Sequence, residues 1–495
     1  MKDPRIDLNP NKLVQYLDKP SEDFSKNDII KFIRDNGIEM LNFRYPAGDG
    51  RLKTLNCVIH SLEQLDTLLS AGERVDGSSL FPYIDASSSD LYVIPRYKTA
   101  FVNPFTEIPT LDILCSYFDH KGDPLASAPE NILKNAQRAL EENTGYTFNA
   151  MGELEYYVFH DDKELFPTVA QKGYHESTPF SKYEVLRAEA MRAIAQAGGQ
   201  IKYGHSEVGN IDAEDRLMEQ HEIEFLPVRA EDAADQLVVA KWIIRNIAYR
   251  HGVNISFAPK VVVGHAGSGL HIHTMLVKNG ENIMSNGAGL SEEARKVIAG
   301  YLDLAPSLTA FGNTIPLSYL RLVPHQEAPT NICWGDRNRS TLVRVPLGWR
   351  GVDDIANQAN PANGDTLARR SNPQTVEFRG PDGSANIYHL IAGLAVGARH
   401  GLEMDNALEM AKKLYVDVNI FSNDHKEVRE KLPQLPASCW ESADQLQSHR
   451  EQYEKYGVFS PVAIDGICRK LKGYDDKDFS ERFYGKGDEI KKMVE

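Results

Sequence analysis

The chain has 495 residues and a mass of 55.4 kDa, too long for one ordinary domain and long enough for a large core. Its 70 acidic and 55 basic side chains give a net charge of −15, which argues against a general binder of nucleic acid or anionic membranes. The five cysteines are scattered and form no CxxC pair, a pattern typical of reduced thiols. No apolar run reaches membrane-spanning length and no signal-peptide pattern is present, so we expect a cytoplasmic protein.

The first part of the chain predicts a small mixed sheet with one or two helices. Residues 1–26 are polar and contain proline, which predicts an N-terminal arm. A helix then ends at Gly37, two strands are joined through 46–50, and strand-like runs return at 91–95 and 113–118. Asp123-Pro124 is typical of a linker, so we expect one domain over 27–123 and another over 124–495.

The second part alternates helices with strands. Helices are predicted over 127–142, 181–197 and 230–250, and strands over 223–226, 260–264, 270–276, 341–345 and 375–379. Beyond Tyr388 the pattern is mostly helical. This alternation predicts an α/β or α+β catalytic body, whose strand order cannot be read from the pattern.

The run GELEYYVF at 152–159 is rich in aromatic and β-branched residues and predicts a strand. Residues two apart on a strand share a face, so Glu153 and Glu155 project side by side among apolar neighbours. Two carboxylates that close in a low dielectric need a shared proton, arginines or divalent metals.

A second acidic stretch, HSEVGNIDAEDRLMEQHEIEF, covers 205–225. Glu207 follows the strand-like run 201–203, while Glu222 and Glu224 alternate with apolar residues, so each sits where an uncompensated carboxylate is costly. The middle, 210–218, is interpreted as a solvated excursion.

The stretch GHAGSGLHIHTML at 264–276 places His271 and His273 on one face of a strand after a turn of small residues. With many carboxylates and no nearby cysteine, the two histidines favour a mixed oxygen and nitrogen site for Mg²⁺ or Mn²⁺. The turn does not match a P-loop and instead suits close approach of backbone to a small ligand.

Arginines gather later in the chain, and two of them, Arg344 and Arg379, lie inside strand-like runs. Arginine grips carboxylates and phosphates in a bidentate manner. Combined with metal-binding carboxylates, this favours phosphoryl transfer onto, or activation of, an acidic substrate.

At this point the motifs are recognisable, because their ordered set resembles glutamine synthetases of the bacterial class I type. They are DGSS at 76–79, GELEYYVF, SEV with QHEIEF, GSGLHIH, RLVPHQEAP, RNRSTLVRVP and VEFRGPDGSAN, in family order from about residue 30 to residue 400. Any one of them is weak, whereas the set is specific.

The resemblance implies an α+β protein with a small N-terminal β-grasp domain and a C-terminal catalytic domain built on a curved antiparallel sheet. It also implies a dodecamer of two stacked hexameric rings. Each active site would lie between neighbouring subunits, completed by the β-grasp domain of the adjacent one.

Site residues carry over motif by motif. One metal would be held by Glu155, Glu207 and Glu222, and a second, beside the ATP phosphates, by Glu153, His271 and Glu377; a third ion can accompany the nucleotide. Glutamate would be held by Arg321, Arg379 and the backbone of Gly267, and the transferred phosphoryl group would face Arg339 and Arg344. Glu327 would close the site as a flap and assist ammonium deprotonation, and ammonium would be bound by Asp76 of the adjacent subunit, with Ser79 nearby.

The implied reaction has two steps. The γ-carboxylate of L-glutamate attacks the terminal phosphate of ATP, and ammonia then displaces phosphate from γ-glutamyl phosphate to give L-glutamine. Two alternatives remain open: a γ-glutamyl ligase that uses a larger amine, such as a polyamine or alkylamine, and a non-catalytic relative. Asp76 and Glu327 suit a small cation and favour ammonium.

Three departures from the family pattern stand out. His265-Ala266 replaces the usual Asp-Asn pair, which leaves flap closure and glutamate affinity open. The interval from Glu207 to Glu222 is 222 − 207 = 15, longer than usual, so an insertion lies beside the first metal site. Tyr415 faintly resembles the tyrosine that is adenylylated in enteric enzymes, but its flanks have diverged and we do not expect the modification.

Overall fold

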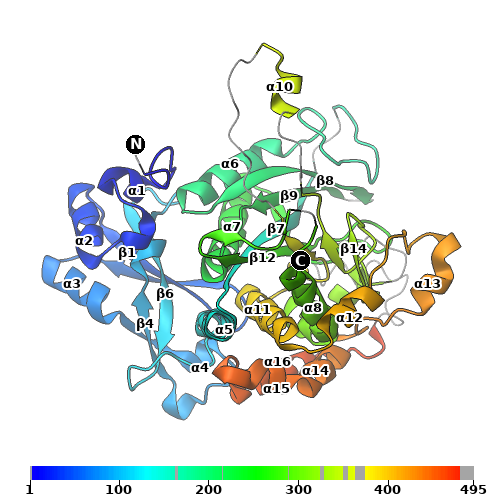
Figure 1. The fold of residues 1–495 in the computed structure, drawn as a ribbon. Coiled ribbons are helices and arrows are strands. Elements are labelled where there is room, and N and C mark those ends of the chain that lie inside the picture. Colours follow the sequence, from blue (N-terminus) through cyan, green and yellow to red (C-terminus); the bar gives the residue numbers. More distant parts are fainter. Residues whose placement is uncertain are drawn as a thin grey trace.

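The computed structural model describes residues 3–161, 165–213, 216–287, 289–323, 328–348, 355–362 and 374–479. They form an N-terminal domain and a larger catalytic domain, which lie side by side in Figure 1. The N-terminal elements are α1 (Lys12–Leu17), α2 (Lys26–Asp35), β1 (Met40–Pro46), β2 (Leu52–Val58), α3 (Leu62–Ala71), β3 (Glu73–Asp76), α4 (Gly77–Leu80), β4 (Asp90–Pro95), β5 (Phe101–Val102) and β6 (Thr110–Phe118).

The N-terminal sheet is mixed, as predicted. Its order is β2-β1-β6-β4-β3, with β1 parallel to β6 and the other pairs antiparallel; β5 also pairs with β6. The segment expected to be an arm contains α1, and Leu13, Val14 and Phe24 are buried in the core of this domain. Leu13 and Val14 lie on the inner side of a short helix, whose first amides are capped by the side chain of Asn11.

The catalytic domain contains the remaining helices and strands. They are α5 (Pro129–Thr144), β7 (Thr147–His160), α6 (Glu184–Gln196), β8 (Ile201–Ala213), β9 (Arg216–Phe225), β10 (Val228–Arg229), α7 (Ala230–Arg250), β11 (Asn254–Ser256), β12 (Leu270–Lys278), β13 (Glu281–Asn282), α8 (Glu292–Gly312), α9 (Ser318–Arg321), β14 (Trp334–Asp336), β15 (Val343–Val345), α10 (Ile355–Ala359), β16 (Val376–Phe378), α11 (Ile387–Glu403), α12 (Ala407–Lys413), α13 (Lys426–Glu430), α14 (Cys439–Ser448), α15 (Arg450–Glu454) and α16 (Pro461–Lys472).

A ten-stranded sheet forms the centre of this domain. Seven of its strands follow the order β14-β15-β16-β12-β7-β9-β8, while β10 and β11 pair with β7 and β13 pairs with β12. Its pairs are antiparallel except β14 with β15. On one face of β7, Leu154 and Tyr156 enter the main core, and a Cβ at Gly152 would lie 2.9 Å from Leu237 of α7. Because helices bury that face, the alternating residues Glu153 and Glu155 point to the opposite, open face.

Two local predictions were wrong. Residues 260–264 form a turn instead of a strand: Lys260 donates to the carbonyl of His265, and Gly264 has φ +85°. Residues 210–218 are largely strand, because β8 and β9 continue into a long hairpin beside α6. Its residues Ile211 and Met218 pack against Val261, so one tertiary contact explains both differences.

The two domains meet through charged contacts. Arg96 grips Asp235 of α7 in a bidentate pair at 2.7 and 2.8 Å, and the Tyr388 hydroxyl donates to the same carboxylate at 2.7 Å. Nearby, Lys98 pairs with Asp232. No helix in the described part of the chain is long and apolar enough to cross a membrane.

Candidate active site

The open face of the large sheet collects acidic and histidine side chains in cross-strand rows. In one row Glu224 of β9 pairs with Glu153 of β7, which pairs with His271 of β12. In the next row Glu222 lies between Glu155 and His205. Directly paired residues share a face, so the register alone brings these groups together.

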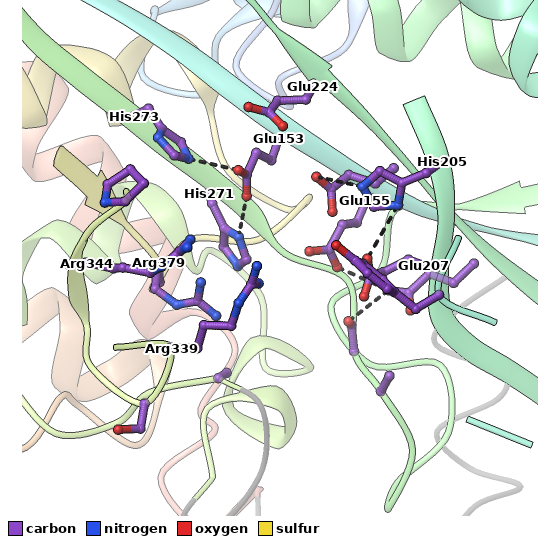
Figure 2. A pocket seen from close by; sticks show the side chains of 18 of the residues that line it. Glu153, Glu155, His205, Glu207, Glu224, His271, His273, Arg339, Arg344 and Arg379 are labelled. Atoms are coloured by element: carbon purple, nitrogen blue, oxygen red, sulfur yellow. Dashed lines mark hydrogen bonds and ion pairs between the residues drawn. The ribbon is translucent and has the colours of Figure 1, made fainter. Parts of the chain in front are cut away.

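These rows line a cavity of about 1430 Å³. Figure 2 shows Glu153 between the two histidines, with three arginines on one side and His205 and Glu207 on the other. The predicted site residues that line this cavity are Glu153, Glu155, Glu207, Glu222, Gly267, His271, Arg321, Arg339, Arg344 and Arg379.

Glu153 is held by both histidines of β12. Its Oε2 lies 2.8 Å from His271 Nδ1, and its Oε1 lies 2.8 Å from His273 Nε2. Burial pushes the pKa of Glu153 up, but the charge of His273 and the hydrogen bonds from the two histidines outweigh it and hold that pKa well below its usual range. Burial lowers the pKa of His271, whereas Glu153 outweighs burial and raises the pKa of His273.

Glu377 of β16 is fully buried beneath two arginines. Arg344 Nη1 donates to its Oε2 at 2.8 Å, and Arg379 Nη1 donates to its Oε1 at 2.7 Å. The charge of Arg379 outweighs burial and lowers the pKa of Glu377. One oxygen each of Glu153 and Glu377 and one nitrogen of His273 lie within 4.8 Å of one another, so this trio can hold a cation.

Glu222 lies in the most acidic part of the cavity. Burial, and then the charges of neighbouring carboxylates with Glu153 and Glu155 foremost, raise the pKa of Glu222 well above its usual range. His205 lies 3.8 Å from Glu222 and 3.7 Å from Glu207, and burial lowers the pKa of His205. His205, Glu207 and Glu222 form a second trio within 4.8 Å, which a divalent cation would neutralise.

Glu155 is held by neutral groups next to the turn of small residues. Its Oε2 accepts from the Gly269 amide at 2.8 Å and from Gln220 Nε2 at 3.1 Å. The turn runs close to its neighbours, since a Cβ at Gly269 would lie 2.8 Å from His271 Nε2. This explains why small residues occupy the turn.

The arginines differ in their freedom to meet a ligand. Arg321 is 5% exposed and donates to the carbonyl of Gly380 at 2.8 Å. Arg339 is exposed and projects into the cavity in Figure 2. Arg344 and Arg379 reach the cavity while they bind Glu377.

Three predicted residues are not part of this constellation. Asp76 caps α4 in the N-terminal domain and accepts from the Ser79 hydroxyl at 2.6 Å; neither residue lines the cavity. Hydrogen bonds from Ser79 and Ser78 lower the pKa of Asp76. Glu327 lies outside the described residues.

Two of the departures from the family pattern, His265-Ala266 and Tyr415, lie among the described residues. His265 and Ala266 line the cavity, and the Ala266 amide donates to Gln171 Oε1 at 2.7 Å. Tyr415 is 41% exposed and packs edge-on against Trp334.

Sequence reasoning missed His205, and it noted His273 and Glu224 without assigning them to the site. A period of two was the available signal, because these residues alternate with Glu207, His271 and Glu222 respectively. What it could not supply was the register that sets His205 opposite Glu222.

The donor set fits a hard divalent cation. Both trios combine carboxylate oxygens with one imidazole nitrogen, and cysteine is absent from them. Such sets suit Mg²⁺ or Mn²⁺, the ions that the sequence favoured. His273 belongs to the trio with Glu153 and Glu377, and the predicted ligand His271 lies 2.8 Å from Glu153 and 3.6 Å from Glu377.

Comparison with known proteins identifies the family of the chain. The family model "Glutamine synthetase, beta-Grasp domain" matches residues 37–120, and "Glutamine synthetase, catalytic domain" matches 126–482. Glutamine synthetase from Clostridium saccharobutylicum is 29% identical over 462 residues, covering 92% of this chain and 96% of that protein. Glutamine synthetase from Streptomyces coelicolor is 30% identical over 475 residues, covering 89% and 93%.

Solved structures share the fold. The ligand-free structure of GmaS has a TM-score of 0.72 at 20% identity and covers 92% of this chain and 97% of its own. Glutamine synthetase of Plasmodium falciparum has a TM-score of 0.73 at 19% identity and covers 93% and 99%. The matches of both domain models, over most of the chain and in the expected order, show that the protein belongs to the glutamine synthetase family of ligases, with the predicted α+β fold and β-grasp domain.

Proposed function

We propose that the protein is an ATP-dependent glutamate–ammonia ligase that makes L-glutamine, ADP and phosphate through γ-glutamyl phosphate. The observation that carries this proposal is the arrangement of two carboxylate and histidine trios on one sheet face, with arginines along the same cavity. Family membership gives the reaction class, and the relatives named glutamine synthetase favour ammonia as the second substrate.

Two divalent ions, Mg²⁺ or Mn²⁺, are proposed for the cavity. Glu155, Glu207 and Glu222, with His205, would hold the first; Glu153, Glu377 and the histidines of β12 would hold the second. When bound, the ions would offset the negative charge that develops as phosphoryl transfer proceeds.

The side chains of this chain would act around those ions. Arg339, exposed in the cavity, is placed to contact a phosphoryl group, and Arg344 lies beside it on the same wall. Arg321, Arg379 and the backbone of Gly267 are proposed to hold glutamate. Closure of the site by Glu327 stays a prediction, with a physical reason: an acyl phosphate hydrolyses unless water is excluded.

Ammonium binding is proposed to need a second copy of the chain. Asp76 and Ser79 lie outside the cavity of their own subunit, so the Asp76 carboxylate would have to come from a neighbour. This is the arrangement that the family resemblance predicts, and the dodecamer remains part of the proposal.

A larger amine is the second candidate, and one feature favours it. Tyr174 lines the cavity with its ring edge-on to His205, 5.3 Å between centroids, and His175 lies 4.4 Å from His205. These rings form a wall beside Glu207 against which an alkyl chain or ammonium head could pack.

The test is ADP release in the presence of ATP, Mg²⁺ and glutamate, with ammonium, ethylamine or putrescine as the only amine. We expect turnover with ammonium, confirmed by detection of glutamine. Turnover with an alkylamine or diamine and none with ammonium would replace the proposal by the second candidate. The absence of turnover with every amine would contradict both and favour a non-catalytic relative.

A further inference from the structure

Strand β8 contains a bulge beside the first proposed cation site. Its pairing with β9 shifts between Ser206 opposite His221 and Asn210 opposite Glu219. Glu207, Val208 and Gly209 therefore face the single residue Gln220. Bulges re-aim side chains near sites, and here the bulge carries Glu207.

Gln220 is fully buried and uses both ends of its amide. Its Oε1 accepts from the Gly209 amide at 3.0 Å, which ties it to the bulge. Its Nε2 donates to Glu155 Oε2 at 3.1 Å and to the Gly267 carbonyl at 3.0 Å. One side chain thus joins the bulge, a proposed metal ligand and the turn proposed to contact glutamate.

The groups around Gln220 are closely packed and held by contacts of their own. A Cβ at Gly209 would lie 2.5 Å from Gln220 Oε1, so glycine is needed where the bulge meets the amide. The turn is held from a second side, since the Tyr157 hydroxyl donates to the Ala266 carbonyl at 2.8 Å. Gln220 is therefore enclosed between elements that are themselves fixed.

We infer that Gln220 is a positioning residue that holds Glu155, the Glu207 bulge and Gly267 in one fixed arrangement. An amide orients the Glu155 carboxylate without cancelling its charge, whereas an arginine in the same place would compete with a cation. Groups that orient metal ligands in this way typically change metal affinity or activity 10- to 100-fold when removed. The inference rests on the proposed function for its catalytic consequence only.

Two variants separate the bonds that Gln220 makes. Gln220→Met keeps the length of the side chain and removes every hydrogen bond. Gln220→Glu keeps an acceptor for the Gly209 amide but replaces the two-donor amide by a carboxyl group, which has one O–H donor when protonated and none when ionised. Gln236→Met is the matched control, because Gln236 is also buried and accepts from the Gln200 amide at 2.9 Å outside the cavity.

For Gln220→Met we expect Mn²⁺ affinity at one of two sites to fall about 10- to 100-fold, measured by calorimetric titration. For both Gln220 variants we expect kcat/KM for glutamate to fall at least tenfold, with a raised glutamate KM, while Gln236→Met keeps both values. Wild-type kinetics for Gln220→Glu would overturn the inference, because support of the bulge alone would then suffice.

Hydrogen exchange of the metal-free protein gives a readout independent of activity. The Gly269 amide donates to Glu155, so its exchange should accelerate in both Gln220 variants and stay unchanged in Gln236→Met. Unchanged exchange together with unchanged Mn²⁺ binding in Gln220→Met would overturn the inference. If the wild type showed no ligase activity, the proposed function would fail while these two measurements still decided the role of Gln220.

Discussion

The cavity has one half around Glu377 and another around Glu222, and the buried carboxylates of the two halves have opposite electrostatic surroundings. Glu377 carries its own counter-charges, Arg344 and Arg379, at 2.8 and 2.7 Å. Glu222, among the described residues, has one ion-pair contact, with His205 at 3.8 Å, and lies among other carboxylates. Both halves sit on one sheet face at similar burial, so the difference comes from the neighbours and not from depth.

This contrast predicts how each half would bind a cation. The Glu377 half is organised before anything binds, and its arginines bring positive charge to the place proposed for phosphates. The Glu222 half has an excess of negative charge that only an external cation or a proton can offset. We expect the Glu377 half to contribute to protein stability and the Glu222 half to depend on bound metal.

The largest effect is expected from Glu377→Gln. This change leaves the buried Arg379 and the partly buried Arg344 without their carboxylate, and breaking a buried pair typically costs about 3 to 5 kcal/mol of stability. Ligase activity should also fall by a factor of about 10³ or more, because a proposed metal ligand is lost. Chemical denaturation and ADP release measure the two losses.

Asp112→Asn is the matched control for that change. Asp112 is fully buried and paired with Arg44 at 2.8 Å in the N-terminal domain, outside the cavity. This variant should lose stability and keep the wild-type kcat of the folded protein. Full activity of Glu377→Gln would contradict its assignment to the second cation site.

A smaller effect, of opposite sign on stability, is expected from Glu222→Gln. Burial and the neighbouring carboxylates disfavour the charged form of Glu222, and glutamine cannot carry that charge, so the metal-free variant should melt at or above the wild-type temperature. Activity should still fall by a factor of about 10² or more, because a proposed metal ligand is lost. Addition of Mn²⁺ should raise the melting temperature less than in the wild type, since ligand stabilisation follows affinity.

Thermal melts with and without Mn²⁺ test this prediction. A metal-free Glu222→Gln variant that melted several degrees below the wild type would show that Glu222 makes stabilising contacts of its own. The two halves of the cavity would then not differ as described.

The smallest effect on the cavity is expected from Glu130→Gln, which changes a buried carboxylate at the domain interface. Burial raises the pKa of Glu130 to about 7 from the ordinary glutamate value of 4.5, and its Oε2 has no hydrogen-bond partner among the described residues. The folded protein therefore binds this proton more tightly than the unfolded chain, and stability falls as pH rises from about 4.5 to about 7.

The difference 7 − 4.5 = 2.5 corresponds to about 3 kcal/mol at most. Between pH 5 and pH 8 the wild type should lose up to that much stability relative to Glu130→Gln, with or without Mg²⁺ and with equal kcat. Parallel pH profiles of the free energy of unfolding for the two proteins would contradict this prediction.

Much of the fold and the general character of the site could be predicted because the relevant signals are local. The helix predicted over 230–250 has those bounds, and the alternation around Glu153 and Glu155 correctly placed both on one face of a strand. The ordered motifs identified the family, which the two domain matches confirmed.

Other features depended on which strands became neighbours. Local pattern favoured a strand over 260–264, whereas this segment is a turn in which Val261 packs against the β8–β9 hairpin. The motif pointed to His271 as the ligand beside Glu377, and His271 Nδ1 lies 3.6 Å from Glu377 Oε1. Cross-strand pairing adds His273, which stands directly opposite Glu377. Nothing local marked Gln220, whose importance comes from the three segments that it joins.

The sequence by itself determined which side chains face the open side of the sheet, because strand periodicity depends only on neighbours along the chain. The same spacing of two puts Arg379 beside Glu377, whereas the tertiary structure brought Arg344 to Glu377 and decided which carboxylates stand beside one another. Register and long-range packing set those distances, and electrostatic energies depend on them directly. The two halves of the cavity therefore share a sheet face and differ in charge balance.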